Sequence, residues 1–206
     1  MHDDAGWIQA ALNGNEAAFG SLVARYQRPV FSLCLRMLGS AEDAEDAAQE
    51  TFVRAFRYLR RYDQERAFGT WLLSIASHYC IDRLRRRRLN VVSLDGLPPW
   101  RWIPGRGEDA EEAAGKAIAA DRIEALLGTL PTAYRVVVVL RYWHDMGYQE
   151  IAELLGDTES AVKSRLHRAR RLLAQGLDSA HEAGSGLAAE ATSTGEIAWI
   201  VTQPAR

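Results

Sequence analysis

The strongest chemical signal in this sequence is residues 83–88, where five of six residues are arginine. Guanidinium groups bind phosphates through paired hydrogen bonds, and unpaired bases stack on aromatic rings such as those upstream of the block. An uninterrupted run of like charge gains nothing from its own neighbours, so an anion is expected nearby. The arginines therefore predict a nucleic-acid ligand, either a duplex edge or a single strand. A solvated helix end is the alternative.

A predicted helix over residues 68–88 positions these arginines. Its apolar residues recur at helical spacing and predict one buried stripe. Thr70 is the expected N-cap, and the arginines fall where the helix dipole is negative. The stripe is expected to comprise Trp71, Leu72, Ile75, Tyr79 and Leu84. The other side is expected to carry Ser74, Ser77, His78 and Asp82.

A second basic block, residues 163–171, lies in a helix-turn-helix pattern. A short helix precedes Gly156, which admits a positive φ, and a longer basic helix follows it. Ala152 is small where the second helix crosses the first. The residues expected to lock the pair are Ile151, Leu155, Val162 and Leu166. Those left facing outward, toward base edges and phosphates of a major groove, are Ser160, Lys163, Ser164, His167, Arg168 and Arg171.

Helical periodicity also dominates residues 15–61. Pro29 interrupts the first segment, which predicts a kink or two abutting helices. Gly39 is the expected left-handed cap, and Ser40 with Asp43 forms a capping box that starts the next helix. That helix is acidic in its first half. Its inward residues are expected to be Ala44, Ala47, Ala48, Phe52, Phe56 and Leu59.

Beyond residue 89 the pattern stops, and residues 90–107 contain three prolines and two tryptophans. This composition predicts a linker. Trp100 and Trp102 either fold back over the DNA-facing surfaces or only anchor the linker to one domain. Helix resumes near Glu108, and Pro131 starts a further helix in which residues 136–140 (VVVVL) are helical rather than a strand. The tail from residue 183 is predicted to be disordered.

Composition limits the possible functions. The chain has 206 residues and a net charge of -2, with acidic and basic residues segregated into blocks. Cys34 and Cys80 are predicted to be free, buried thiols. No apolar run approaches the ~18 residues of a membrane span, and the start of the chain is acidic, unlike a secretory signal. We therefore expect a cytoplasmic protein without membrane insertion.

No constellation for catalysis is recognisable. The sequence lacks a phosphate-binding glycine loop, a His-Glu-x-x-His motif and paired cysteines. His78 and Asp82 lie one helical turn apart and could imitate a base and its orienting carboxylate, but no nucleophile accompanies them. The sequence predicts no enzyme, no cofactor and no metal site.

Together these motifs resemble those of bacterial RNA polymerase sigma factors of the small, two-domain extracytoplasmic-function (ECF) group. The resemblance covers roughly residues 19–173 and rests on 46–56 (DAAQETFVRAF), 68–76 (FGTWLLSIA), 81–86 (IDRLRR), Leu130-Pro131 and 161–166 (AVKSRL). It implies an all-α chain with region 2 over residues 1–89, a linker over 90–115, region 4 over 116–180 and a tail over 181–206.

The resemblance also implies partners and site residues: core RNA polymerase, promoter DNA and an anti-sigma factor. The residues implied to contact the polymerase are Asp46, Gln49, Glu50, Phe52 and Phe56. Those implied to bind unpaired DNA near position minus ten are Asp63, Arg66, Phe68, Ser74, His78, Asp82, Arg83 and Arg86. Those implied to bind duplex DNA near minus thirty-five are Ser160, Lys163, Ser164, Arg165, His167 and Arg168.

Two positions depart from the family pattern. His78 stands where asparagine is common, and Asp157 stands where the turn usually buries an aliphatic residue, which predicts a looser turn. An operator-binding regulator is the alternative function. It would explain the helix-turn-helix, but would leave the acidic helix and the arginine-ended helix without a purpose.

Overall fold

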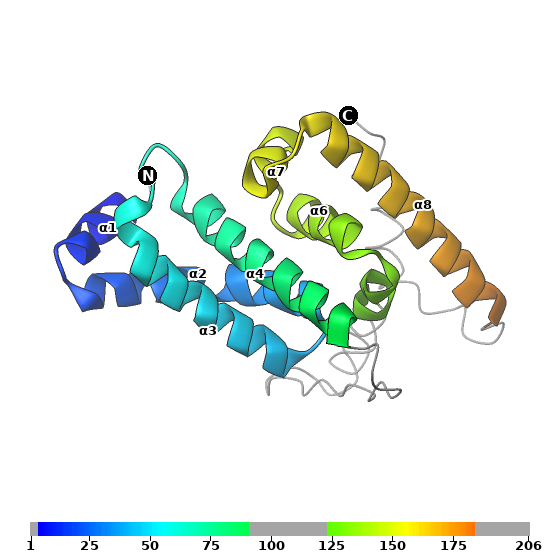
Figure 1. Cartoon of the computed structure of the whole chain (residues 1–206), viewed down its shortest axis with the longest axis horizontal. Coiled ribbons are helices and arrows are strands. Elements are labelled where there is room, and N and C mark those ends of the chain that lie inside the picture. Colours follow the sequence, from blue (N-terminus) through cyan, green and yellow to red (C-terminus); the bar gives the residue numbers. More distant parts are fainter. Residues whose placement is uncertain (1–3, 91–122, 184–206) are drawn as a thin grey trace, which may run out of the picture. The chain divides into compact units, whose positions relative to one another are not determined.

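The computed structural model of the chain describes residues 4–90 and 123–183 (Figure 1). Within these ranges every regular element is a helix, which confirms the all-α prediction. The chain divides into two compact units, the first with α1 to α4 and the second with α6, α8 and the first part of α7. Trp100, Trp102 and nearly all of the predicted linker and tail lie outside the described residues.

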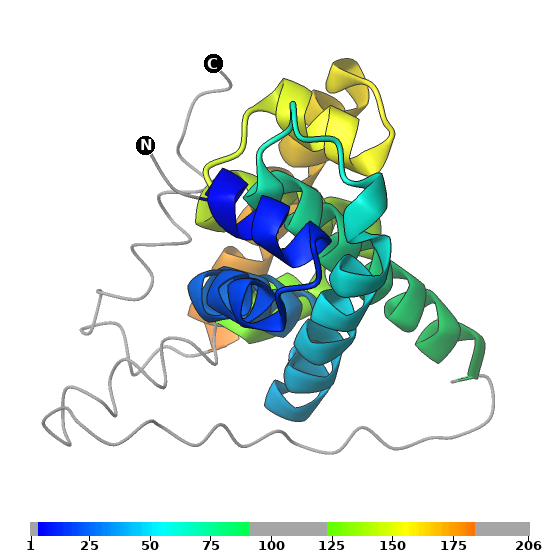
Figure 2. The same cartoon turned by 90° about the vertical axis from the view of Figure 1, so that its left-hand side faces the viewer.

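The first unit begins with α1 (Asp4–Leu12), a helix that the sequence reasoning did not predict. Figure 2 looks along α2 (Glu16–Leu38), with α1 beside it. Ile8 of α1 is buried, and the Tyr26 hydroxyl of α2 donates a 2.6 Å hydrogen bond to Asp4. Arg25 forms a 3.1 Å ion pair with the same carboxylate. A polar anchor and an apolar contact therefore hold α1 against α2.

Helix α2 continues through Pro29 as one element, so of the two predicted alternatives the abutting helices were wrong and the kink stays a prediction. Proline removes one backbone hydrogen bond, but tertiary packing on both sides can outweigh that loss. Leu22 before the proline and Leu33 after it are fully buried. Asn15 caps the start by accepting a 3.1 Å hydrogen bond from the Ala18 amide. Gly39 ends the helix at φ 72°, as predicted.

Helix α3 (Ala41–Tyr58) starts at the predicted cap, where the Ser40 hydroxyl accepts a 3.3 Å hydrogen bond from the Asp43 amide. Its inward face is made of small residues, which let α2 and α4 approach closely. They are Ala44, Ala47, Ala48, Thr51 and Ala55. Phe56 was expected to point inward, but it is 51% exposed. A 3-10 turn, η1 (Leu59–Arg61), ends the segment.

Helix α4 (Phe68–Asn90) starts two residues before the predicted cap, Thr70. The Trp71 amide donates to the Ala67 carbonyl at 3.1 Å, so Thr70 lies inside the first turn. The buried stripe is also rotated from the predicted one. It comprises Phe68, Leu72, Ala76 and Cys80, and Ser77, expected outside, is fully buried. Small side chains at 76 and 77 allow close packing, which periodicity of large apolar residues does not reveal.

The two cysteines meet in this core. Cys34 of α2 and Cys80 of α4 are both free and fully buried, as predicted. A hydrogen bond with Cys34, together with burial, raises the pKa of the Cys80 thiol. The Cys80 thiol therefore remains neutral, and both cysteines are small, buried core residues.

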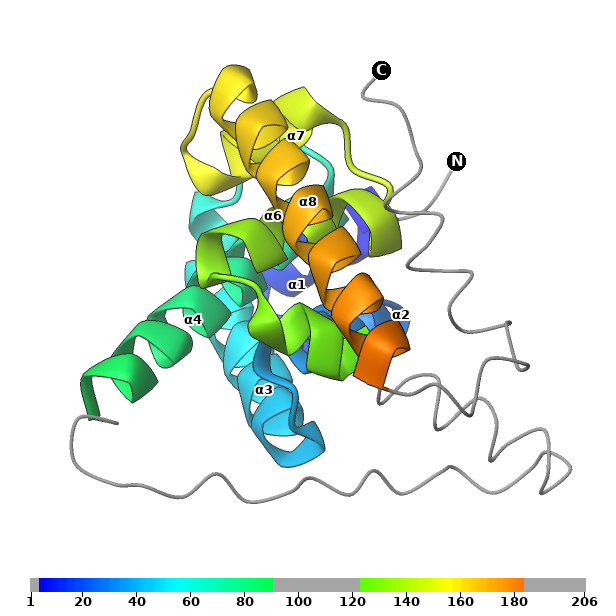
Figure 3. The same cartoon turned by 90° about the vertical axis from the view of Figure 1, so that its right-hand side faces the viewer.

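The second unit contains α6 (Thr132–Trp143), the first part of α7 (Tyr148–Leu155) and α8 (Glu159–Ala183), all visible in Figure 3. Residues 123–129 are also helical. Pro131 precedes α6 at φ -52°, and residues 136–140 are helical, as predicted. All five of these are at most 2% exposed, because α6 is the central helix of this unit's core. Around it pack Leu127, Leu130, Ile151, Val162, Leu166, Ala169 and Leu173.

Candidate nucleic-acid and partner interfaces

The predicted polymerase contacts follow the solvent side of α3. Asp46 and Gln49 are exposed, and Glu50 is half-buried in a 2.8 Å ion pair with Arg54. Phe56 is an exposed aromatic residue whose ring meets Phe19 of α2 edge-on, with ring centroids 5.0 Å apart. Exposed aromatic rings are enriched at surfaces that bind a protein partner.

Next to this surface is a groove of about 430 Å³ between α2 and α3. The predicted contacts include Gln49 and Phe52 of its α3 wall, but no residue of its α2 wall. Phe31 of α2 and Phe52 of α3 supply its apolar lining, with Arg28 and Glu45 at its polar parts. The full lining is Val23, Gln27, Arg28, Phe31, Glu45, Ala48, Gln49 and Phe52.

The loop before α4 rests on a cluster of aromatic rings. Phe68 lies at the centre, with ring centroids 5.5 Å from Tyr26, 5.4 Å from Tyr62 and 5.6 Å from Trp71. Phe68 is only 3% exposed, so it supports the loop from beneath and its side chain offers little surface to a DNA strand. Its expected DNA contact stays a prediction that this burial does not favour.

The polar residues of that loop are exposed. Asp63 accepts a 3.0 Å hydrogen bond from the Glu65 amide, which forms a tight turn. Arg66 lies 3.9 Å from the Asp63 carboxylate, at the limit of an ion pair. Both side chains are more than half exposed, at 60% for Arg66 and 57% for Asp63. They are accessible to a ligand, as their predicted role requires.

Farther along α4, Ser74, His78 and Asp82 follow one another at four-residue spacing. The Ser74 hydroxyl donates to the Trp71 carbonyl at 2.7 Å, and His78 Nδ1 donates to the Ser74 carbonyl at 2.7 Å. In the neutral ring this leaves Nε2 as an acceptor. Asp82 pairs with Arg85 at 3.2 Å. The three side chains form the partly exposed polar row that the sequence predicts.

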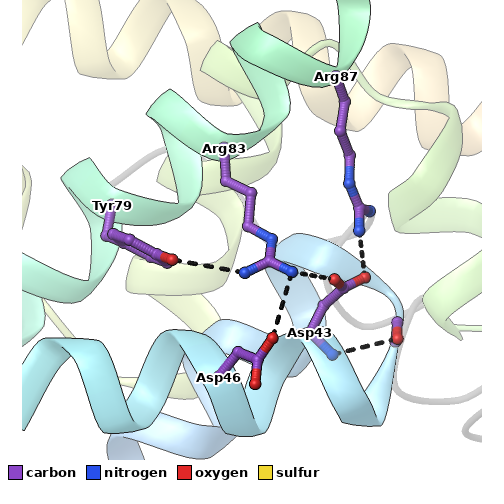
Figure 4. A network of polar contacts seen from close by, with 6 residues as sticks. Asp43, Asp46, Tyr79, Arg83 and Arg87 are labelled. Carbon is purple, nitrogen blue, oxygen red and sulfur yellow. Dashed lines mark hydrogen bonds and ion pairs between the residues drawn. The ribbon is translucent and has the colours of Figure 1, made fainter. Parts of the chain in front are cut away.

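The arginines of α4 do not share one environment, and Figure 4 shows the two that contact Asp43. Arg86 is exposed, whereas Arg83 donates to Asp43 and lies 3.5 Å from Asp46. Arg87 donates to the second oxygen of Asp43. Sequence reasoning treated Asp43 only as part of a helix cap and missed this pairing, since the partners are forty residues apart.

The charges around Asp43 change its titration. Burial alone would raise the pKa of this carboxyl. The hydrogen bond from Arg87 and the positive charges of Arg87 and Arg83 outweigh burial and hold its pKa below the ordinary value. Asp43 is therefore an anion at neutral pH, where it binds two arginines.

The helix-turn-helix has the predicted geometry. Gly156 has φ 68°, and Ala152 is buried where the helices cross. Leu154 is buried while Leu155, the residue expected to lock the pair, is half-exposed. On α8 every residue predicted to face outward is exposed: Ser160, Lys163, Ser164, His167, Arg168 and Arg171. The second helix therefore presents a continuous polar and basic face.

Arg165 is the exception on this helix. It is half-buried and donates two hydrogen bonds to Asp157, the one from Nη2 to Oδ1 measuring 3.0 Å. The expectation that Asp157 loosens the turn was therefore wrong, because its carboxylate ties the turn to α8. The DNA contact expected of Arg165 stays a prediction.

A basic and aromatic corner beside the turn was missed by sequence reasoning. The Tyr148 ring at the start of α7 lies 5.2 Å from the Arg141 guanidinium and 5.6 Å from the Lys163 ammonium. Lys163 also pairs with Glu159 at 2.6 Å. The residues next to Tyr148 in the sequence do not indicate this cluster, because the two cations come from α6 and α8.

The described ranges contain neither a cluster for a metal ion nor a helix for a membrane span. Residues 4–90 and 123–183 bring together no group of three or more histidine, cysteine, aspartate or glutamate side chains suited to a metal ion. Among the helices of these ranges, none has the length and apolar character that crossing a bilayer requires.

Comparison with known proteins connects both units to one family. The sigma-70 region 2 family model matches residues 22–89, and the sigma-70 region 4 family model matches residues 120–173. The ECF RNA polymerase sigma factor SigW of Bacillus subtilis (strain 168) is 35% identical over 172 residues, which cover 81% of this chain and 92% of SigW. The RNA polymerase sigma factor CnrH of Cupriavidus metallidurans (strain ATCC 43123 / DSM 2839 / NBRC 102507 / CH34) is 34% identical over 188 residues, 87% of this chain and 98% of CnrH.

A solved structure shows the same relationship in three dimensions. CnrH in complex with the cytosolic domain of CnrY superposes with a TM-score of 0.62 and 31% sequence identity, covering 86% of this chain and 99% of CnrH. The matches extend through both helical units, in the order that the motifs predict. The chain therefore belongs to the ECF sigma factors of the sigma-70 family.

Proposed function

We propose that this protein is an alternative sigma factor that joins core RNA polymerase and directs it to a particular set of promoters. The observation that carries this proposal is the pair of family matches, region 2 on the first helical unit and region 4 on the second. The protein contributes recognition, while the polymerase supplies catalysis. Its place of action is the cytoplasm, where promoter DNA and polymerase meet.

The first unit supplies the polymerase contact in this proposal. The exposed side of α3 carries Asp46, Gln49 and Phe56, and the neighbouring groove presents Phe31 and Phe52. A surface with acidic side chains and a neighbouring apolar groove suits a partner with basic and apolar residues, because charge steers the encounter and apolar burial supplies affinity. Glu50 completes the set of expected contacts.

The same unit would hold the opened promoter strand near minus ten. The exposed Asp63 and Arg66 of the loop, with Ser74, His78 and Asp82 on α4, give hydrogen-bonding groups along one path. An extruded base needs such groups on its edge, and Arg86 can bind a phosphate. Burial of Phe68 beneath the loop supports a rigid platform.

The second unit would bind duplex DNA near minus thirty-five. Lys163, Ser164, His167 and Arg168 are exposed along α8, and Ser160 lies near its start. Helix-turn-helix proteins place the first turns of the second helix in the major groove, where side chains of these types reach phosphates and base edges. The four-residue spacing keeps them on one side of the helix.

A protein partner of the anti-sigma kind is also part of the proposal. CnrH, the solved relative, is in complex with the cytosolic domain of CnrY. An inhibitor of this chain would have to cover the exposed side of α3 or the basic side of α8, since these are the surfaces that the polymerase and DNA need.

The deciding experiment is a binding assay with purified core RNA polymerase, followed by transcription from a promoter library. We expect the chain to bind core enzyme and to direct initiation at promoters that share two short sequence elements. An operator-binding regulator would bind duplex DNA alone and fail to join the core enzyme. That outcome would reject the sigma-factor function.

A further inference from the structure

The arginine-rich end of α4 has two differently used sides. Tyr79, Arg83 and Arg87 recur every four residues, so they share one side of the helix. All three are part of the contact with α3 (Figure 4). Arg85 and Arg86 are exposed instead, with Arg85 72% exposed in its ion pair with Asp82. One block of like charge in the sequence is thus divided in the fold.

Asp43 is the centre of the α3 side. Its side chain is 11% exposed, and each carboxylate oxygen accepts a hydrogen bond from a different arginine, Oδ1 from Arg83 and Oδ2 from Arg87. Its own amide is bound to the Ser40 hydroxyl. The position in the first turn of α3 also favours a negative charge because of the helix dipole. The two arginines therefore hold both oxygens of the carboxylate.

Both terminal nitrogens of the Arg83 guanidinium have partners within the protein. Besides Asp43 it lies 3.5 Å from Asp46, and its Nη1 donates to the Tyr79 hydroxyl at 3.4 Å. The Tyr79 ring in turn lies under the Arg54 guanidinium of α3, 4.8 Å away. With its side chain 26% exposed, Arg83 could reach a phosphate only by leaving a mostly buried carboxylate. Breaking such a pair is costly.

We propose that Asp43 is a positioning residue for promoter binding. It binds Arg83 and Arg87 so that the last turns of α4 are fixed against α3, and Arg85 and Arg86 are thereby presented to the DNA backbone. Arg83, which the sequence predicts to contact DNA, instead holds α4 against α3 through Asp43. This inference rests on the proposed binding of opened DNA along α4.

The division of roles has a measurable signature. Each phosphate contact that is lost lowers the salt slope of binding by about one. A positioning residue changes affinity without changing the number of phosphates neutralised. Residues that act without touching the ligand typically change binding by about two- to thirtyfold. The salt slope therefore separates the two roles where affinity alone does not.

The test uses holoenzyme assembled from the full chain and core polymerase, with promoter DNA already opened over the minus-ten element. Dissociation constants are measured over a range of salt for Asp43→Asn, Arg83→Gln, Arg87→Gln and Arg86→Gln. We expect the first three to weaken binding about threefold or more with an unchanged slope. Arg86→Gln should lower the slope by about one.

A double variant isolates the pairing. Asp43→Asn with Arg83→Gln should weaken binding no more than the stronger single variant, because both changes break the same contact. Circular dichroism checks that each protein is folded. Arg87→Gln should disturb the fold least, because the Arg87 side chain is 40% exposed. If folded variants bind opened DNA with the wild-type constant, the network is only structural and the proposal is overturned.

Two further outcomes are distinguishable. If Arg83→Gln and Arg86→Gln each lower the salt slope of binding by about one, Arg83 contacts the DNA directly. That result overturns the positioning role, while DNA binding by α4 stands. If neither Arg86→Gln nor Arg85→Gln changes the salt slope of binding, this end of α4 does not contact the DNA. The positioning role then falls with it.

Discussion

Asp157 in the turn and Arg165 on α8 are joined by two parallel hydrogen bonds, in a pair whose side chains are 29% and 28% exposed. The carboxylate precedes the first turn of α8, and the arginine lies two turns into it. Such a bidentate pair has one strongly preferred geometry. It fixes the direction in which α8 leaves the turn and occupies an arginine that the sequence alone would assign to DNA.

The first prediction separates Arg165 from its neighbour Arg168. Arg168→Ala removes an exposed cation on the proposed DNA side, so the salt slope of duplex binding should fall by about one. Arg165→Ala breaks the pair with Asp157 and should lower the free energy of unfolding by about 1 kcal/mol, with a smaller change in slope. Titrations of promoter duplex by holoenzyme and urea unfolding measure the two quantities. An equal fall in slope for both variants would assign Arg165 to the DNA.

A second prediction concerns Phe56, a 51% exposed aromatic residue on the proposed polymerase surface. Phe56→Ala should weaken binding to core polymerase by at least about tenfold, since exposed aromatic anchors often dominate protein interfaces. Stability should change little, because about half of the side chain is already exposed in the folded protein. Tyr58→Ala is the matched control, as Tyr58 is 47% exposed on the same helix but was not assigned to the interface. Equal losses in a competition assay would argue against a defined surface.

The third prediction is a pH dependence from Asp43. Its pKa in the folded protein is lower than in the unfolded chain, where an aspartate has a pKa of about 3.9. The stabilisation is therefore fully present above that value and is lost as the pH falls through the lower, folded-state pKa. Urea unfolding of the wild type and of Asp43→Asn should differ most near neutral pH and converge in acid. A difference that grows below pH ~4 would contradict the assigned partners.

A fourth prediction tests close packing at the start of α4. A Cβ at Gly69 would lie 2.9 Å from Cε1 of Tyr26, whose hydroxyl is bound to Asp4 and whose ring packs on Phe68. The ring cannot move freely, so Gly69→Ala should destabilise the protein by about 1–3 kcal/mol. Gly20→Ala is the control. A Cβ there meets no atom within 4 Å, and alanine in helix α2 should stabilise by about 0.5–1 kcal/mol. Thermal unfolding of both variants compares the two positions, and a stable Gly69→Ala protein would show that the Tyr26 ring yields.

Local features of this protein were determined by the sequence itself. Gly39 and Gly156 have the left-handed conformations expected of them, and Ser40 caps α3. These are properties of a few adjacent residues, since capping hydrogen bonds and positive φ angles depend on neighbours only one turn away. The exposed row on α8 was predictable for the same reason: once Val162 and Leu166 are buried, helical geometry alone decides which residues point outward.

Only the tertiary structure decided which charged groups are paired. Asp43 meets Arg83 because two helices forty residues apart pack through small residues, and the rotation of α4 that brings them together also buries Ser77. Long cationic side chains can reach several partners from one backbone position, so their sequence spacing does not identify the partner. The same reason hid the role of Arg165, bound to Asp157, whereas the role of Phe68 was decided by its burial beneath the loop. Residue type and periodicity specify the helices, whereas the rotation and contact of one helix against another determine which arginines remain free for DNA.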